Sequence, residues 1–178
     1  MVIDVQKGFS AYDVPGKRNN PSCEANVSKL IQAWRDAGAP IVFVRHDSIL
    51  PDSVLRPGQP GNDFKEVITG EPDLLVTKSV NSAFYGTPDL KTWLDQNQIE
   101  SIAICGIQTN MCCETTARMG GNLGYEVWFV LDATHTFAKT VGTETVSAEE
   151  LSRVTAVNLS GEFAEILSTD EAVARVSG

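Results

Sequence analysis

The sequence predicts a three-layer, doubly wound α/β fold, in which helices cover both faces of a mostly parallel sheet. Short apolar runs typical of buried strands alternate along the chain with segments of helical pattern, and strands separated by helices indicate a parallel sheet. The 178 residues fit one domain with a sizeable core, and we see no repeat, low-complexity segment or linker that would divide them. We therefore expect a single Rossmann-like domain over residues 1–178.

Six apolar runs are the predicted strands. They lie at residues 2–5, 41–44, 74–77, 99–105, 126–131 and 163–167. The run Ile-Val-Phe-Val at 41–44 has no polar position, which is typical of a strand covered on both faces. Because parallel strands end at the same edge of a sheet, residues that follow these runs are expected to lie close together.

Helical patterns fill the intervals between the predicted strands. Helices are expected over residues 22–37, 88–96 and 110–123, with two more that begin near Ser147 and Thr169. Ser22 is the predicted N-cap of the first helix, and Gly38 ends it. Pro88 is placed in the first turn of the second helix, where a proline is tolerated. Glu150 is expected to complete a capping box with Ser147.

A long segment rich in Pro, Gly and Asp follows the second predicted strand, over residues 47–70. It is longer than a simple connection requires, and long loops often cover binding sites. Arg56 lies within it and is a candidate to clamp a substrate carboxylate, although a solvated loop arginine is the alternative. Substrate specificity is therefore expected to depend on this loop.

The composition excludes several classes of partner. The net charge is −9 and the pI about 4.6, which argues against a nucleic-acid partner because phosphate binding needs basic patches. No apolar run approaches the roughly 20 residues that span a bilayer, so we expect no membrane association. Asp4 and Lys7 interrupt the first apolar stretch, so a signal peptide is not expected.

The chain has four cysteines, at positions 23, 105, 112 and 113. Their spacing fits neither a disulfide framework nor a zinc site, and a reducing, cytoplasmic location is the simplest interpretation. Cys105 lies inside an apolar run and is expected to be core, whereas Cys23 is expected to be a surface or partly buried residue without function.

The segment 106–118 places a cysteine just past a strand and near the start of a helix. Free N–H groups and the helix dipole favour an anion there, which predicts a lowered pKa for Cys112 and a thiolate at neutral pH. Asp4 and Lys78 also lie at the carboxyl ends of predicted strands. Together they provide a base and a charge partner for a nucleophile, and the N–H groups of Gln108 and Cys112 are the expected oxyanion donors.

Four further residues are candidates with two open interpretations each. His46 follows the second strand and either lines the site, where it could accept a hydrogen bond from substrate, or has a structural role. Phe9 and Phe84 flank Asp4 and Lys78 in the sequence and are expected either to form pocket walls or to belong to the core. His135 follows the fifth strand, and a structural role is favoured.

Three motif blocks, in order, carry a resemblance to a known family. They are Val-Ile-Asp-Val-Gln-Lys-Gly-Phe at 2–9, Thr-Lys-Ser-Val-Asn-Ser-Ala-Phe at 77–84, and Gly106 to Arg118. The chain resembles the isochorismatase-like cysteine hydrolases, which include nicotinamidases and N-carbamoylsarcosine amidases. The resemblance implies an Asp4, Lys78 and Cys112 triad, and a cis peptide between Ile107 and Gln108 that turns the Gln108 N–H into an oxyanion hole.

Two departures from the family pattern bear on the site. Cys113 stands where family members often have valine or another apolar residue, but the spacing of three from Thr109 selects Cys112 as the nucleophile. Nicotinamidases bind a metal through an Asp-x-His pair and further histidines. Here the order is His46-Asp47 and only His135 remains, so we expect neither a metal nor another cofactor.

The resemblance implies a hydrolase that cleaves an amide or related C–N bond of a small molecule through a thioester. The alternatives are a vinyl-ether hydrolase of the isochorismatase type, which needs an acid but no thiol nucleophile, and a catalytically idle member that binds a metabolite. Family members also suggest a homo-oligomer, either a dimer or a tetramer.

Overall fold

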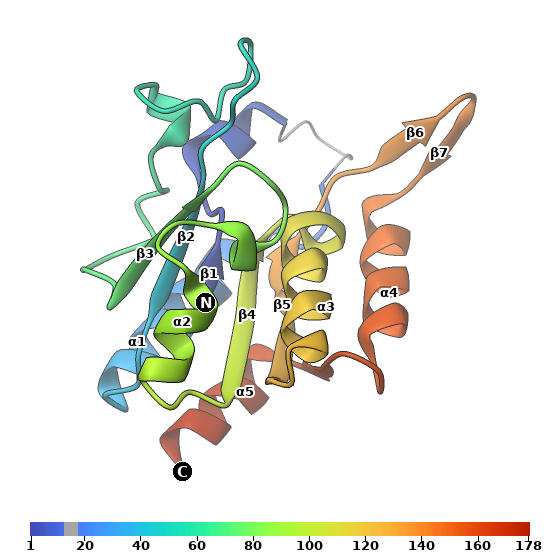
Figure 1. The fold of residues 1–178 in the computed structure, drawn as a ribbon. Coiled ribbons are helices and arrows are strands. Elements are labelled where there is room, and N and C mark those ends of the chain that lie inside the picture. Colours follow the sequence, from blue (N-terminus) through green and yellow to red (C-terminus); the bar gives the residue numbers. More distant parts are fainter. Residues whose placement is uncertain (13–17) are drawn as a thin grey trace.

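The computed structural model describes residues 1–12 and 18–178, and its centre is a six-stranded sheet (Figure 1). The sheet strands are β1 (Val2–Ile3), β2 (Val42–His46), β3 (Leu74–Lys78), β4 (Ser101–Ile107), β5 (Glu126–His135) and β8 (Glu165–Leu167). They lie in the order β3-β2-β1-β4-β5-β8, and every neighbouring pair is parallel. The predicted α/β fold and all six predicted strands are confirmed.

Helices cover both faces of this sheet. They are α1 (Cys23–Asp36), α2 (Leu90–Gln96), α3 (Glu114–Asn122), α4 (Ala148–Leu159) and α5 (Thr169–Ser177). Helices α1 and α5 pack together on one face, and α2, α3 and α4 cover the other (Figure 1). Each face has its own apolar cluster of buried side chains. The order in which strands are added to the sheet reverses between the neighbouring strands β1 and β4, and ligands bind doubly wound sheets at the carboxyl ends beside such a switch point.

Four short helical elements lie in the connections between the strands and the helices. Three are 3₁₀ helices, η1 (Lys7–Tyr12), η2 (Pro60–Asn62) and η3 (Ala83–Tyr85), and the fourth is a π-helical turn, η4 (Thr109–Cys113), that leads into α3. A hairpin of β6 (Lys139–Val141) and β7 (Glu144–Val146) projects from the body of the molecule (Figure 1). This hairpin was not predicted from the sequence.

Several predicted boundaries were wrong. The first strand ends at Ile3 rather than residue 5, because Asp4 adopts a φ of +51° and leaves the extended conformation. The second helix starts at Leu90 rather than residue 88, because the Asp89 side chain caps the helix by accepting from the Thr92 N–H at 2.6 Å.

The predicted caps have mixed outcomes. Ser22 is the N-cap residue of α1, but its side chain accepts no capping hydrogen bond. The Ser147 hydroxyl accepts from the Glu150 N–H at 3.1 Å, but the Glu150 side chain does not complete the predicted capping box of α4. Helix α5 has a full capping box between Ser168 and Glu171. Cys23 was expected near the surface, and that was wrong: it is fully buried beneath α1, since it occupies the core-facing side of the first turn.

Gly106 stands where β4 runs closest to β1. Its φ is +126°, and a Cβ here would lie 2.0 Å from the carbonyl oxygen of Ile3. We expect Gly106→Ala to lower the free energy of unfolding by about 3 kcal/mol or more, because backbone strain and steric collision add. In the control Gly124→Ala, φ is also positive at +91° but nothing lies within 4 Å of the added Cβ, so the loss is about 1 kcal/mol. Urea unfolding followed by circular dichroism measures both, and equal losses would contradict this account.

None of the helices in the described part of the chain combines the length and apolar character needed to cross a membrane.

Candidate active site

The carboxyl ends of β1, β2 and β3 bring three polar side chains together. His46 and Lys78 are paired in register at the ends of β2 and β3, and Asp4 directly follows β1. The positive φ of Asp4 turns the chain at this point, while its N–H still donates to the Val44 carbonyl at 2.9 Å. Asp4 and Lys78 are both buried, although charged residues usually remain at the surface.

Asp4 and Lys78 form a buried ion pair. The ammonium Nζ donates to Oδ2 of Asp4 at 2.6 Å, and both side chains are wholly excluded from solvent. Burial alone would lower the pKa of Lys78, but the charges of Asp4 and Cys112 outweigh it and the pKa is raised. Oδ1 of Asp4 is also buried and has no hydrogen-bond partner among the described residues. The carboxylate therefore keeps one oxygen available to receive a proton.

The Lys78 ammonium also contacts the imidazole of His46, with Nζ 3.2 Å from Nδ1. An ammonium can only donate, so Nδ1 is the acceptor and the neutral ring carries its proton on Nε2. Burial lowers the pKa of His46, and the neighbouring positive charge of Lys78 lowers it further. His46 is therefore a neutral member of this cluster at physiological pH.

Cys112 reaches the same cluster from the turn η4 and is buried. Its Sγ lies within 4.8 Å of a carboxylate oxygen of Asp4 and of a ring nitrogen of His46. Burial and then the negative charge of Asp4 raise the pKa of Cys112 to about 12, against the opposing effect of Lys78. The prediction of a thiolate at neutral pH was therefore wrong, because desolvation of the sulfur outweighs its place near a helix start.

This pKa has a consequence for alkylation of the resting protein. We expect the rate of Cys112 modification by iodoacetamide to rise about tenfold per pH unit between pH 7 and pH 10, because only the thiolate reacts. Mass spectrometry of quenched samples measures the rate at each pH. A rate that levels off near neutral pH would show a thiolate in the resting site and contradict the assignment of a protonated thiol.

Hydrogen bonds to β5 hold the turn that carries Cys112. The Thr109 hydroxyl donates to Thr134 at 2.8 Å, and Thr134 in turn donates to the Leu131 carbonyl at 2.9 Å. These bonds fix the start of η4 against the end of β5. Strand β5 extends to His135 rather than Leu131, and without that extension Thr134 would not stand beside the turn.

The backbone before Cys112 has an unusual path. The peptide bond between Ile107 and Gln108 is cis. The Gln108 carbonyl accepts from the N–H groups of Met111 at 3.1 Å and Cys113 at 3.3 Å, and these bonds skip the N–H of Cys112. The amides of Gln108 and Cys112, which were the expected oxyanion donors, thus stand at the two ends of this short segment.

Sequence reasoning missed the side chains that clamp His46. The buried amide of Gln6 accepts from the His46 N–H at 2.8 Å and donates to its carbonyl at 3.0 Å. Asn62, in the long loop, donates to the same carbonyl at 3.0 Å and to the Leu55 carbonyl at 2.9 Å. These two amides join the 47–70 loop to the strand ends. The one sequence signal that could have suggested a role for Gln6 is its position two residues after Asp4.

Asn81 is a second residue that was not predicted. Its Oδ1 lies 3.8 Å from Sγ of Cys112, within reach of a weak S–H donor. It belongs to the loop between Lys78 and η3, and that loop is fixed to α3 by a hydrogen bond from the Ala83 N–H to the Thr116 hydroxyl at 3.1 Å. The motif block 77–84 therefore brings Asn81 as well as Lys78 to Cys112.

Of the remaining candidates, three are buried and one is exposed on the long loop. Phe9 and Phe84 are buried in the two core clusters, and the Phe84 ring stacks on Tyr125 at the opposite end of β5, with centroids 5.8 Å apart. Arg56 is exposed and donates to the Pro51 carbonyl within its own loop at 3.1 Å. His135 is buried with its ring edge against Phe137 at 5.2 Å, which agrees with a structural role.

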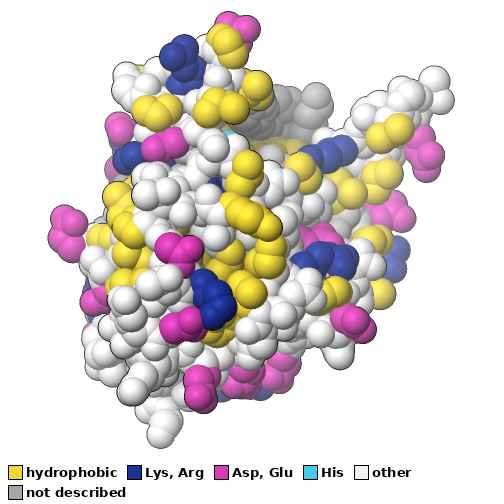
Figure 2. Space-filling view, in the orientation of Figure 1, with side chains coloured by type: hydrophobic (Ala, Val, Ile, Leu, Met, Phe, Trp, Pro, Cys, Tyr) yellow, Lys and Arg dark blue, Asp and Glu magenta, His cyan; other side chains and the backbone are white. Residues whose placement is uncertain are grey.

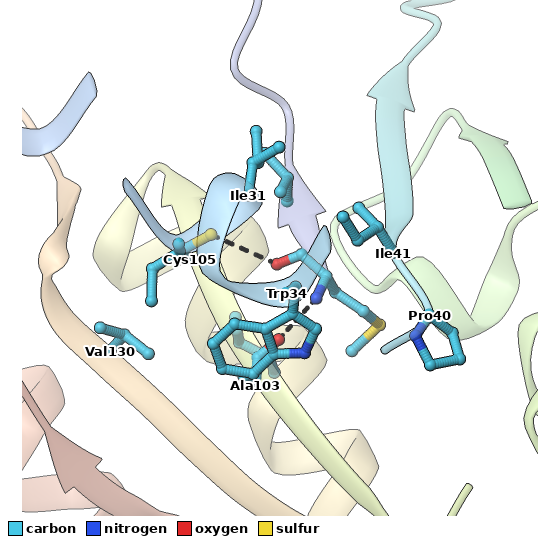
Figure 3. Close-up of a pocket in the computed structure, with 11 residues that line it drawn as sticks. Ile31, Trp34, Pro40, Ile41, Ala103, Cys105 and Val130 are labelled. Atoms are coloured by element: carbon cyan, nitrogen blue, oxygen red, sulfur yellow. Dashed lines mark hydrogen bonds between the residues drawn. The ribbon is translucent and has the colours of Figure 1, made fainter. Parts of the chain in front are cut away.

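A separate apolar pocket lies at the other end of β1, between α1 and the sheet (Figure 3). Ile31, Trp34, Ile41 and Val130 contribute to its wall, and the Met1 ammonium within it donates to the Ala103 carbonyl at 2.6 Å. Cys105 donates to the Met1 carbonyl there. Because this pocket lies at the amino-terminal strand ends, it is not part of the cluster around Asp4.

Comparison with known proteins agrees with the fold and the motif blocks. Residues 1–171 match the isochorismatase domain family, and YrdC, an isochorismatase family protein of Bacillus subtilis, is 35% identical over 97% of this chain and 92% of its own length. Nicotinamidase 3 of Arabidopsis thaliana is 31% identical over 96% of this chain and 84% of its own length. The crystal structure of a cysteine hydrolase from Pseudomonas syringae pv. phaseolicola is 28% identical, with a TM-score of 0.88, and the match covers 99% of this chain and 90% of that chain. The chain therefore belongs to the isochorismatase family, and it is a hydrolase.

Proposed function

We propose that this hydrolase cleaves an amide or a related C–N bond of a small molecule through a thioester on Cys112, with Asp4 and Lys78 as its catalytic partners. One observation carries the proposal. A thiol, a carboxylate with one unpartnered buried oxygen, and an ammonium meet at the carboxyl ends of the sheet. A nucleophile, a base and a fixed positive charge are the parts that nucleophilic acyl transfer requires.

The high pKa of Cys112 determines how the first step begins. The thiol is protonated at rest, so Asp4 removes its proton as sulfur attacks the carbonyl carbon of the substrate. Backbone N–H groups of Gln108 and Cys112 donate to the oxyanion that forms. Asp4 then returns the proton to the leaving nitrogen, the C–N bond breaks, and the acyl group remains on Sγ as a thioester.

Hydrolysis of the thioester uses the same carboxylate. Asp4 takes a proton from a water molecule as the water oxygen attacks the thioester carbonyl, and the thiol leaves with that proton. Lys78 holds the carboxylate in place through the 2.6 Å contact and keeps a positive charge beside the reacting groups. One residue thus acts as base and acid in turn, and no metal ion is needed for either step.

The nicotinamidase among the relatives supports a C–N bond as the target, because it is a related hydrolase named for an amide substrate. The His46 ring supports a substrate with a hydrogen-bond acceptor, since Nδ1 faces Lys78 and the proton is left on Nε2. We give Phe9 and Phe84 no direct part in the chemistry, because a phenyl ring offers no proton or nucleophile, and we give Arg56 none because it is exposed.

A substrate screen tests this function. Purified protein is incubated with a panel of small amides, ureas and nicotinamide, and ammonia release is measured by a coupled assay. We expect turnover of at least one amide or urea, with a protein carrying Cys112→Ser as the inactive control. Cleavage of a vinyl ether such as isochorismate without action on any C–N bond in the panel would contradict the proposal.

We also propose that the protein forms a homo-oligomer. Three exposed valines support it, Val141 at 83% on the projecting hairpin, and Val157 at 65% and Val154 at 41% on α4. Exposed apolar surface of this kind is typical of a protein interface. Light scattering after gel filtration measures the mass, and a monomer at micromolar concentration would contradict the proposed homo-oligomer.

On the face covered by α2, α3 and α4, acidic and basic side chains are interspersed, which does not favour a nucleic-acid partner (Figure 2).

A further inference from the structure

The Lys78 ammonium lies among three groups that are all ligands of metal ions. Asp4 offers a carboxylate oxygen, His46 a ring nitrogen and Cys112 its sulfur, and these ligand atoms all lie within 4.8 Å of one another. The ammonium is 2.6 Å from Asp4 and 3.2 Å from His46, and its charge also acts on the Cys112 thiol. The cluster, which we name the cation cradle, therefore already surrounds one positive charge.

The three ligands form a set that suits a thiophilic divalent cation. Zinc sites with catalytic or exchangeable character have three protein ligands of the sulfur, nitrogen and oxygen types and keep a fourth position open. Tetrahedral zinc places its ligand atoms roughly 3.5 Å apart, so movements of about an ångström would close the cradle around the ion. No such set was visible in the sequence, because the ligands come from positions 4, 46 and 112.

The His46 ring is oriented for this role. Its Nδ1 lone pair faces into the cradle, because that atom accepts from the ammonium. Gln6 and Asn62 donate to the His46 carbonyl at 3.0 Å, and the His46 N–H donates to Gln6 at 2.8 Å, so the His46 backbone is held on both sides. A ligand whose backbone is fixed and whose lone pair already points to a cation loses little freedom when it binds a metal.

We propose that Asp4, His46 and Cys112 bind a thiophilic divalent cation such as Zn²⁺ in competition with the Lys78 ammonium, and that the bound ion inhibits the enzyme. The inhibition rests on the proposed function, because the ion would hold the sulfur and the carboxylate that carry out hydrolysis. Binding itself does not rest on it. When the ion binds, the Cys112 thiol releases its proton to solvent, and the ammonium leaves the cradle or loses a proton.

This competition makes an unusual prediction for Lys78→Met. The variant removes the positive charge that occupies the cradle and leaves all three ligands in place. Repulsion between that charge and a divalent ion about 4 Å away opposes binding in the wild type. We therefore expect Lys78→Met to bind Zn²⁺ roughly tenfold more tightly or better than the wild type. Lys78 is not itself one of the three ligands. A gain in affinity for Zn²⁺ in Lys78→Met would therefore show that its charge opposes binding of the ion.

Cobalt absorption gives a readout that needs no substrate. Co²⁺ is added to the wild type and to Lys78→Met, and the thiolate-to-cobalt charge-transfer band is recorded, followed by displacement with Zn²⁺ against a chromophoric chelator. We expect the band in both proteins, with tighter binding in Lys78→Met. Cys112→Ser should lose the band, His46→Gln should weaken binding by roughly tenfold or more, and the neighbouring-thiol control Cys113→Ala should keep it.

The outcomes separate this proposal from the proposed function. A charge-transfer band that persists in Cys112→Ser, or an affinity that falls or stays equal in Lys78→Met, would overturn the cradle as a metal site. Circular dichroism of each variant shows that it is folded before titration, and Cys112→Ser, which is nearly isosteric, carries the test if Lys78→Met unfolds. With an amide substrate from the screen, Zn²⁺ should abolish turnover and a chelator should restore it. Zinc binding without inhibition would contradict the site's role in hydrolysis and leave the binding result standing.

Discussion

Replacing Cys112 with serine is expected to lower kcat by roughly 10⁴-fold or more, because a serine hydroxyl in this site has no base strong enough to activate it and no thioester can form. The change keeps the size of the side chain, so the fold and the cluster around Asp4 should remain. Steady-state kinetics with the substrate found in the screen measures the loss, and thermal unfolding checks that the variant is intact.

Cys113→Ala is the matched control for this prediction. Cys113 is fully buried and adjacent to Cys112, but its side chain belongs to the apolar cluster beneath α3. Burial raises its pKa well above the ordinary value, so it is inert as a nucleophile. We expect this variant to lose about 1 kcal/mol of stability and to retain most of its turnover. Full activity in Cys112→Ser, with loss in Cys113→Ala, would reverse the assignment of the two thiols.

The second large effect concerns the buried pair of Asp4 and Lys78. Lys78→Met leaves the buried Asp4 carboxylate without its counter-ion, and Asp4→Asn leaves the buried Lys78 ammonium without its counter-ion. Each single change is therefore expected to lower the free energy of unfolding by about 3–5 kcal/mol. The double variant has no buried charge, so most of that stability should return. Urea unfolding of the four proteins measures these differences.

Activity should not follow stability in this set. Asp4→Asn and the double variant lose the general base, which lowers rates by about 10²–10⁴-fold. Lys78→Met leaves Asp4 without the ammonium that holds it. All three variants are therefore expected to be strongly impaired in kcat, including the stable double variant. If the single variants fail to fold, the double variant alone carries the comparison. A double variant that is both stable and active would show that the pair is structural and that Asp4 takes no proton.

The pH dependence of stability follows from the same pair. The pKa of Lys78 is raised in the folded protein, so its contribution is fully present below the unfolded value of about 10.4 and is lost only as pH rises through the folded value. The contribution of Lys78 to stability should therefore be unchanged across the neutral range. A decline that begins near pH 7 would need another titrating group.

Much of the site's location could be predicted from the sequence because it follows from sheet topology. Residues that come directly after apolar runs lie at one edge of a parallel sheet, and this rule applies to Asp4, His46 and Lys78. The rule does not depend on the exact residue at which a strand ends. The errors in the predicted end of β1 and start of α2 therefore did not change the predicted location of the site. For Phe9 and Phe84 the sequence left a pocket wall and a core position open, because nearness in sequence says nothing about the direction of a side chain, and the structure places both in the core clusters.

What the sequence did not predict depends on burial and on contacts between distant segments. The protonation of Cys112 is set by the desolvation of its sulfur and the charge of Asp4, neither of which a local motif reports. The amide clamp of Gln6 and Asn62 joins positions 56 residues apart. The hairpin of β6 and β7 has short strands with little apolar alternation, so no periodic signal marks it.

The most direct test of the account is the detection of an acyl group on Cys112 during turnover. The Cys113→Ala protein is mixed with the amide found in the screen, quenched with acid and digested with trypsin, so that the peptide around position 112 has only two thiols, Cys105 and Cys112, which fragmentation distinguishes. Mass spectrometry should find that peptide heavier by the acyl group of the substrate, and neutral hydroxylamine should remove the added mass. Turnover of the same amide with no acylated peptide under rapid quench, together with activity in Cys112→Ser, would contradict the thioester mechanism.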